Sequence, residues 1–221
     1  MWRDLMKKAT GVSYILLALG AALGLMLEVV LGYGIEPVLY GSQIKEWSEM
    51  QFIIHWIIIC VIWGVICFLL VHSAKKRYGF DLFAKGEKVK AWQWILIAAL
   101  IVLSLAVSYR DWNGSKVLAE FQRLGIVRFA FQYLYYFFEM GLVTLILVFG
   151  QKACEKWFKR ADIPYGGIVI ALTWGIGHFF TQDFLTGILC VISGLAYGSI
   201  YLLVNRDIYK TYLILWIMFV L

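Results

Sequence analysis

Residues 51–73 read QFIIHWIIICVIWGVICFLLVHS, and this stretch decides the fold class of the chain. It contains no Asp, Glu, Lys or Arg. An α-helix rises 1.5 Å per residue, so about 20 apolar residues are needed to cross the hydrocarbon core of a bilayer. The stretch therefore predicts a membrane-spanning helix.

Six other apolar blocks extend this prediction to the whole chain. The seven blocks cover residues 12–34, 51–73, 91–109, 127–150, 165–180, 183–204 and 208–221. The fifth and the last are short for a crossing, which leaves six crossings as an alternative to seven. Only 15% of the residues are charged, whereas a soluble domain has about a quarter. We therefore predict a single all-α domain over residues 1–221, a polytopic transmembrane helix bundle with about seven membrane segments.

The distribution of positive charge predicts the orientation of this bundle, because Lys and Arg are enriched in loops on the cytoplasmic side. With a cytoplasmic N-terminus, the inner segments hold 15 of the 20 Lys and Arg residues, and loops 74–90 and 151–164 contribute most of them. We therefore expect a multi-pass protein of the plasma (inner) membrane. Topology and the anionic headgroups of the lipid bilayer account for the net charge of +6, so no nucleic-acid partner is expected.

Four ionisable residues within the apolar blocks stand out as candidates, namely Glu28, His55, Glu139 and His178. A charged side chain facing lipid costs about 2.5 kcal/mol or more, so an intramembrane ionisable residue marks a candidate functional site. Glu139 follows Gln132 and Tyr136 at helical spacing, which places the three on one helix face. We expect this polar face to line a wet cavity.

His178 lies four residues after Trp174, so these two side chains share a face. One interpretation is an interfacial histidine beside an aromatic belt. The other interpretation is a functional site. Gly175 and Gly177 favour it, because glycines allow a backbone or a ligand to come close. Glu28 and His55 are expected near the outer interface. If the helices adjoin, this set of imidazoles and carboxylates has the ligand types of a zinc or other transition-metal site.

Residues 133–221 resemble the CAAX-protease and bacteriocin-processing (CPBP, or Abi) family of intramembrane proteases. Trp174–Gly–Ile–Gly–His178 resembles the aromatic-x-x-x-His motif of that family, and the glycine-bearing stretch around Gly194 resembles the helix that follows it. Glu139 stands where one glutamate of the Glu-Glu-x-x-x-Arg motif is found. The second glutamate, the arginine and the later histidine of the family have no counterpart here.

The resemblance implies an intramembrane metal-dependent endopeptidase, or a catalytically degenerate relative that handles a membrane peptide or protein substrate. It implies Glu139 and His178 as catalytic residues, and a divalent metal such as zinc held by His178, Glu139 and His55. A serine-protease alternative at Ser193 is disfavoured, because no histidine follows His178. The alternative function is a small-solute or ion-binding membrane protein, such as a transporter or a substrate-binding subunit, with Gln132, Tyr136 and Trp174 lining its pocket.

Overall fold

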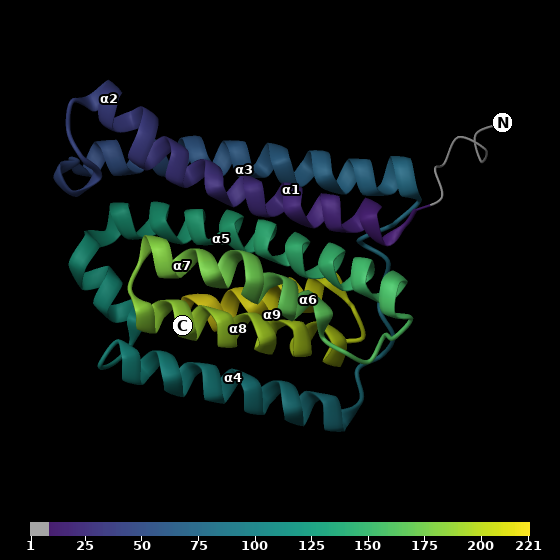
Figure 1. Cartoon of the computed structure of the whole chain (residues 1–221). Helices are drawn as coiled ribbons and strands as arrows, with labels where there is room; N and C mark the ends of the chain where they lie inside the picture. The colour runs from purple at the N-terminus through teal and green to yellow at the C-terminus, as the bar shows by residue number, and fades with distance from the viewer. Residues whose placement is uncertain (1–8) are drawn as a thin grey trace.

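The computed structural model describes residues 9–221, and this range folds into helices joined by short turns, without a β-strand (Figure 1). The helices are α1 (Gly11–Val30), η2 (Leu31–Ile35), α2 (Glu36–Tyr40), η3 (Ile44–Glu46), α3 (Glu49–Tyr78), α4 (Ala91–Asp111), α5 (Lys116–Phe158), α6 (Tyr165–Ile170), η4 (Ala171–Gly175), α7 (Ile176–Thr181), α8 (Phe184–Leu203) and α9 (Ile208–Val220). The predicted all-α bundle is confirmed.

Five helical segments are long and apolar enough to cross a membrane. They are Gly11–Tyr40, Glu49–Tyr78, Ala91–Asp111, Lys116–Phe158 and Phe184–Leu203. The segments Tyr165–Thr181 and Ile208–Val220 are apolar but shorter, and they correspond to the two blocks that the sequence marks as short. The predicted membrane protein with transmembrane helices is therefore supported.

The second half of α5 forms the centre of the bundle. Its residues from Met140 to Gly150 are almost all buried, and α1, α3, α6 and α9 pack around them. By contrast, α4 packs on α8 and α9 at the periphery and leaves most of its apolar side chains exposed (Figure 1). Exposed apolar side chains on an outer helix are what a lipid environment requires.

Helix α5 begins earlier than the apolar block predicts, because its first residues form a fold-back segment. Gly125 has φ +71° and ψ 168°, which breaks the helix at that point. Glycine lacks a Cβ and adopts this conformation without strain. Residues 116–124 therefore lie at an angle across the end of the bundle, between α4 and the rest of α5 (Figure 1), and the buried Glu120 accepts hydrogen bonds from Gln132 (2.8 Å) and Tyr136 (2.7 Å).

Helices α6 and α8 cross at very close range through glycines. A Cβ on Gly167 would lie 2.6 Å from the carbonyl oxygen of Gly194, and a Cβ on Gly198 would lie 2.6 Å from the backbone nitrogen of Gly167. Real Cβ atoms do not approach backbone so closely, so these positions admit only glycine. Gly194 and Gly198 thus allow α8 to pack closely against α6 within the same chain.

Two membrane segments contain a wide π-helical turn. One is η2, between α1 and α2, and the other is η4, between α6 and α7. Such turns are rare and occur often at functional sites, because the extra residue redirects the side chains that follow. Gly32 of η2 and Trp174 of η4 both line the same cavity.

Candidate functional site

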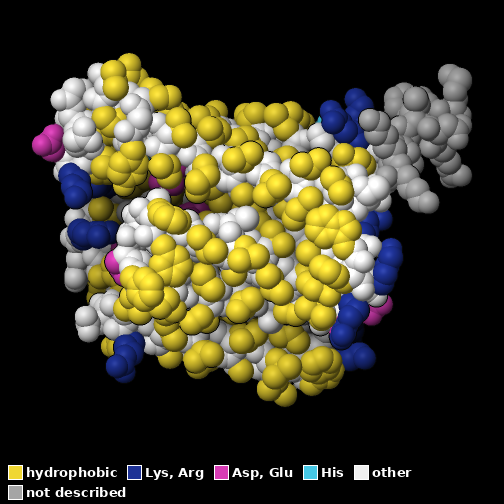
Figure 2. Space-filling model, viewed as in Figure 1, with side chains coloured by type: hydrophobic (Ala, Val, Ile, Leu, Met, Phe, Trp, Pro, Cys, Tyr) yellow, Lys and Arg dark blue, Asp and Glu magenta, His cyan; other side chains and the backbone are white. Residues whose placement is uncertain are grey.

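A cavity of about 420 Å³ lies in the half of the bundle near α2, between α1 and α3 on one side and η4 and α7 on the other. Figure 2 shows a hollow on the flank of the molecule, with acidic side chains inside it and apolar surface around it. Leu23 and Met26 of α1 line the cavity and are themselves exposed on the flank. The cavity is thus open sideways, on an apolar flank of the bundle.

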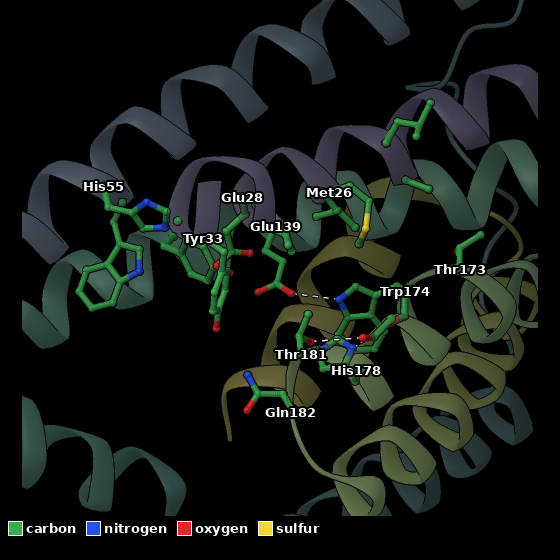
Figure 3. Close-up of a pocket in the computed structure, with 18 of the residues that line it drawn as sticks. Met26, Glu28, Tyr33, His55, Glu139, Thr173, Trp174, His178, Thr181 and Gln182 are labelled. Carbon is green, nitrogen blue, oxygen red and sulfur yellow. Dashed lines mark hydrogen bonds between the residues drawn. The ribbon is translucent and has the colours of Figure 1, made fainter. Parts of the chain in front are cut away.

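Glu139 enters this cavity from the buried centre of α5. Its side chain is 7% exposed, and Oε1 accepts a hydrogen bond of 3.0 Å from the indole nitrogen of Trp174 (Figure 3). Trp174 is held in place by contact with Tyr197 and Phe219. The expectation that Glu139 faces a cavity rather than lipid agrees with this position. The indole fixes one carboxylate oxygen and leaves the other for a ligand.

His178 lies one helical turn beyond Trp174 and also lines the cavity. Its Nδ1 is 2.8 Å from the carbonyl oxygen of Trp174, and its ring is 4.6 Å from the Trp174 ring system. Because a carbonyl only accepts, Nδ1 carries the proton and Nε2 remains an acceptor. Trp174 therefore links His178 to Glu139, whereas the sequence led us to expect that these two residues share a metal ion.

Glu28 provides a second carboxylate to the cavity, from α1. Figure 3 shows Glu28 and Glu139 on the same side of the cavity, each pointing into it from a different helix. Both carboxylates therefore belong to the lining of one cavity. In surroundings of low dielectric two adjacent carboxylates repel each other unless a proton or a cation lies between them. This part of the cavity is therefore suited to a positive group.

His55 lies at the opposite end of the cavity from His178 (Figure 3). Its Nδ1 is 2.5 Å from Oε2 of Glu36, and both side chains are buried. The other oxygen of Glu36 has no hydrogen-bond partner among the described residues. His55 also contacts Trp47 of the loop between η3 and α3. This contact between Glu36 and His55 ties α2 to α3 at the end of the cavity away from His178.

The residues expected to hold a zinc ion do not gather into one site. Within residues 9–221 no three His, Cys, Asp or Glu side chains lie close enough together to hold a metal ion. His55 is engaged by Glu36, and Nδ1 of His178 is engaged by a carbonyl group. A catalytic zinc needs three protein ligands and an open position. The geometry therefore gives the expected divalent metal no support.

The expected pocket residues separate into two groups. Trp174 lines the cavity, whereas Gln132 and Tyr136 bind Glu120 of the fold-back segment instead. Tyr135, which directly precedes Tyr136, lines the cavity in its place. No sequence signal distinguishes Tyr135, because it is one of three tyrosines at positions 133, 135 and 136. Glu36 also escaped sequence reasoning, because it follows the first apolar block.

Comparison with known proteins identifies no family for this chain. No family model matches the chain, and no curated protein or solved structure matches it either. The resemblance of residues 133–221 to CPBP proteases therefore rests on the motif residues themselves. Function has to be argued from the chemistry of the cavity.

Proposed function

We propose that this protein is a non-cleaving relative of the CPBP intramembrane proteases, which binds a segment of a membrane peptide in the cavity beside Glu139. The sideways opening supports this proposal. A peptide segment in the bilayer reaches the cavity past Leu23 and Met26 without leaving the membrane. A binding site that opens only to water would require the apolar peptide to leave the lipid first.

The paired carboxylates Glu28 and Glu139 carry the proposal further, because they specify what the cavity recognises. Trp174 holds one oxygen of Glu139 and leaves the other oxygen free to accept a hydrogen bond. A Lys or Arg side chain of the peptide supplies both a donor and a positive charge. Such charge-assisted hydrogen bonds are about twice as strong as neutral ones. The ligand we propose is thus an apolar segment with a cationic residue in its outer half.

Binding without cleavage follows from the groups that are present. Peptide hydrolysis needs an activated water molecule, a general base within reach of it, and a group that stabilises the developing negative charge. Glu139 and His178 supply a carboxylate and a neutral imidazole acceptor. No Lys or Arg among the described residues lines the cavity to stabilise an oxyanion, and its ionisable lining consists of Glu28, Glu139 and two histidines. The two carboxylates of the cavity favour the binding of a cation.

We further propose a cytoplasmic N-terminus and location in the plasma (inner) membrane. Loops 74–90 and 151–164 lie at the same end of the bundle, and this end carries most of the Lys and Arg residues (Figures 1 and 2). The positive-inside rule then places that end in the cytoplasm. Single cysteines introduced in either loop are expected to react with a membrane-impermeant maleimide only after the cells are opened. Labelling of one loop in intact cells would contradict this orientation.

The function is tested with two model peptides in lipid nanodiscs. Both are apolar helices of about 20 residues, one with a single lysine in its outer half and one with leucine there. We expect the lysine peptide to bind the protein in a fluorescence titration, and Glu139→Gln to weaken its binding about tenfold or more, since a hydrogen bond to a charged group contributes about 1.5–3 kcal/mol. Glu49→Gln, an exposed glutamate outside the cavity, is the matched control.

Mass spectrometry of the same samples tests the absence of cleavage. The lysine peptide is expected to remain intact during long incubation with and without added zinc. Fragments that form with the wild-type protein and not with His178→Ala would refute the non-cleaving proposal. Equal binding of the two peptides, unchanged by Glu139→Gln, would refute recognition of a cation.

A small cationic solute is the second candidate ligand, because a volume of about 420 Å³ also falls within the range of small-molecule sites. The two candidates differ in the route of entry. Met26→Trp adds bulk at the sideways opening and is expected to slow binding of the lysine peptide. Tight binding of a soluble amine, unaffected by Met26→Trp, would favour the solute instead.

A further inference from the structure

A groove separate from the cavity lies at the other end of the bundle, between α3 and α9. It has a volume of about 530 Å³, and its wall is almost entirely apolar. Cys67 and Phe68 of α3 form one side, Tyr212 of α9 forms the other, and Gly141 and Leu145 of α5 form the floor. We propose that this groove binds one acyl chain of an anionic phospholipid, with the lipid phosphate at Lys75.

The floor of the groove is open because α5 has a glycine there. Helices α3 and α5 pack together, as do α5 and α9, and Gly141 lies where their side chains leave a channel. Thr144 adds no free donor, since its hydroxyl donates a 2.6 Å hydrogen bond to the carbonyl of Met140. A groove floor without free polar groups is suited to a hydrocarbon chain.

The length and direction of the groove match one leaflet of a bilayer. Its lining runs along α3 from Lys75 back to Cys67, which is eight residues or about 12 Å along the helix axis. Half of the hydrocarbon core is about 15 Å thick. A chain in this groove therefore lies parallel to the helices, as the acyl chains of the leaflet do.

The charge at the open end of the groove identifies the headgroup. Lys75 lines the rim, and its side chain is 66% exposed. It is paired with Asp81 at 3.1 Å, but an exposed pair of this kind contributes little and yields readily to a phosphate. Residues 75–90 contain six Lys or Arg against two Asp or Glu. Such a basic segment beside a membrane helix attracts anionic lipids.

Aromatic residues at the rim mark the level of the headgroups. Tyr209 is 59% exposed and packs against Phe83 with ring centroids 5.8 Å apart. His72 stacks on Phe68 one turn below Lys75. Tyrosine is enriched where the hydrocarbon meets the headgroups. The rim therefore places the phosphate beside Lys75 and the ester groups near His72 and Tyr209.

The proposal is tested by photo-crosslinking of the full chain in vesicles. One set of vesicles contains phosphatidylglycerol with a diazirine on one acyl chain, and the other set contains phosphatidylcholine with the same label. We expect phosphatidylglycerol to label peptides of α3, α5 and α9 around the groove several-fold more than phosphatidylcholine does. Lys75→Gln is expected to lower this preference about fivefold, as the loss of one cation near an anionic headgroup predicts.

Gly141→Leu tests occupation of the groove itself. A Cβ at Gly141 would meet only the Cys67 sulfur, at 3.5 Å, which is ordinary van der Waals contact, so the protein is expected to fold with a filled groove. Labelling of the groove peptides should then be lost, whereas Ala99→Leu, on an exposed surface of α4, should leave it unchanged. Melting temperatures measured in detergent confirm that both variants are folded.

Two outcomes would overturn the proposal. In the first, both lipids label the groove equally and Gly141→Leu changes nothing, which means that lipid contacts here are unselective. In the second, the groove peptides crosslink to a second copy of the chain rather than to lipid. Neither outcome depends on peptide binding at Glu139, since Gly141 and Lys75 are absent from the cavity lining.

Discussion

Gly198→Leu is expected to abolish folding of the chain. A Cβ at this position would lie 2.6 Å from the nitrogen and 2.7 Å from the Cα of Gly167, and both atoms are backbone. Backbone cannot rotate out of the way as a side chain can, so α6 and α8 would have to separate. Overpacking of a well-packed interior typically costs about 1–3 kcal/mol, and a rigid contact places leucine above this range. We expect no monodisperse protein after detergent extraction.

Alanine at two glycines gives a matched comparison with a smaller effect. Gly198→Ala should lower the melting temperature although alanine is the better helix former by about 1 kcal/mol. Gly177→Ala should leave it unchanged or raise it, because a Cβ there would meet only the end of Met26, at 3.8 Å. A Gly198→Ala protein as stable as the wild type would mean that α6 and α8 do not cross this closely.

The membrane segments could be predicted from the sequence because hydropathy is a local property. Residues 51–73 have to form a helix in a bilayer whatever their neighbours do, since lipid offers no partner for backbone groups. The fold-back segment of α5 could not be predicted in the same way. Residues 116–124 include several charges, and only the docking of Glu120 against Gln132 and Tyr136 brings them into the bundle.

The candidate site was predictable to the extent that it depends on spacing within one helix. Trp174 and His178 share a face, and their contact follows from a separation of four residues. The hydrogen bond from Trp174 to Glu139 depends on how two distant helices pack, which a single sequence does not reveal. The π turns η2 and η4 could not be predicted either, because no local pattern of residues marks them.

Glu36→Ala is expected to lower the free energy of unfolding by about 3 kcal/mol, the upper end of the usual cost of leaving a buried polar group without its hydrogen-bond partner. The His55 and Glu36 side chains are each 3% exposed, so no water replaces the lost carboxylate. The buried imidazole of His55 would still pay the free-energy cost of leaving water, and it would no longer have the hydrogen bond to Glu36 that offsets this cost. Asp162→Asn provides the control, since the Arg160–Asp162 pair is exposed and its loss should cost less than about 1 kcal/mol.

Replacing both Glu36 and His55 separates two contributions to stability. One is the interaction between the two side chains, and the other is the cost of leaving one of them buried without its partner. In the double variant Glu36→Leu with His55→Leu neither group is left buried without a partner, and apolar replacement of a buried pair is often neutral. We therefore expect the double variant to be more stable than either single one, measured by chemical denaturation in detergent. If the loss of stability in the double variant equals the sum of the losses in the two single variants, Glu36 and His55 do not interact. The double variant should fold and still bind the lysine peptide, because it leaves Glu28 and Glu139 of the cavity unchanged.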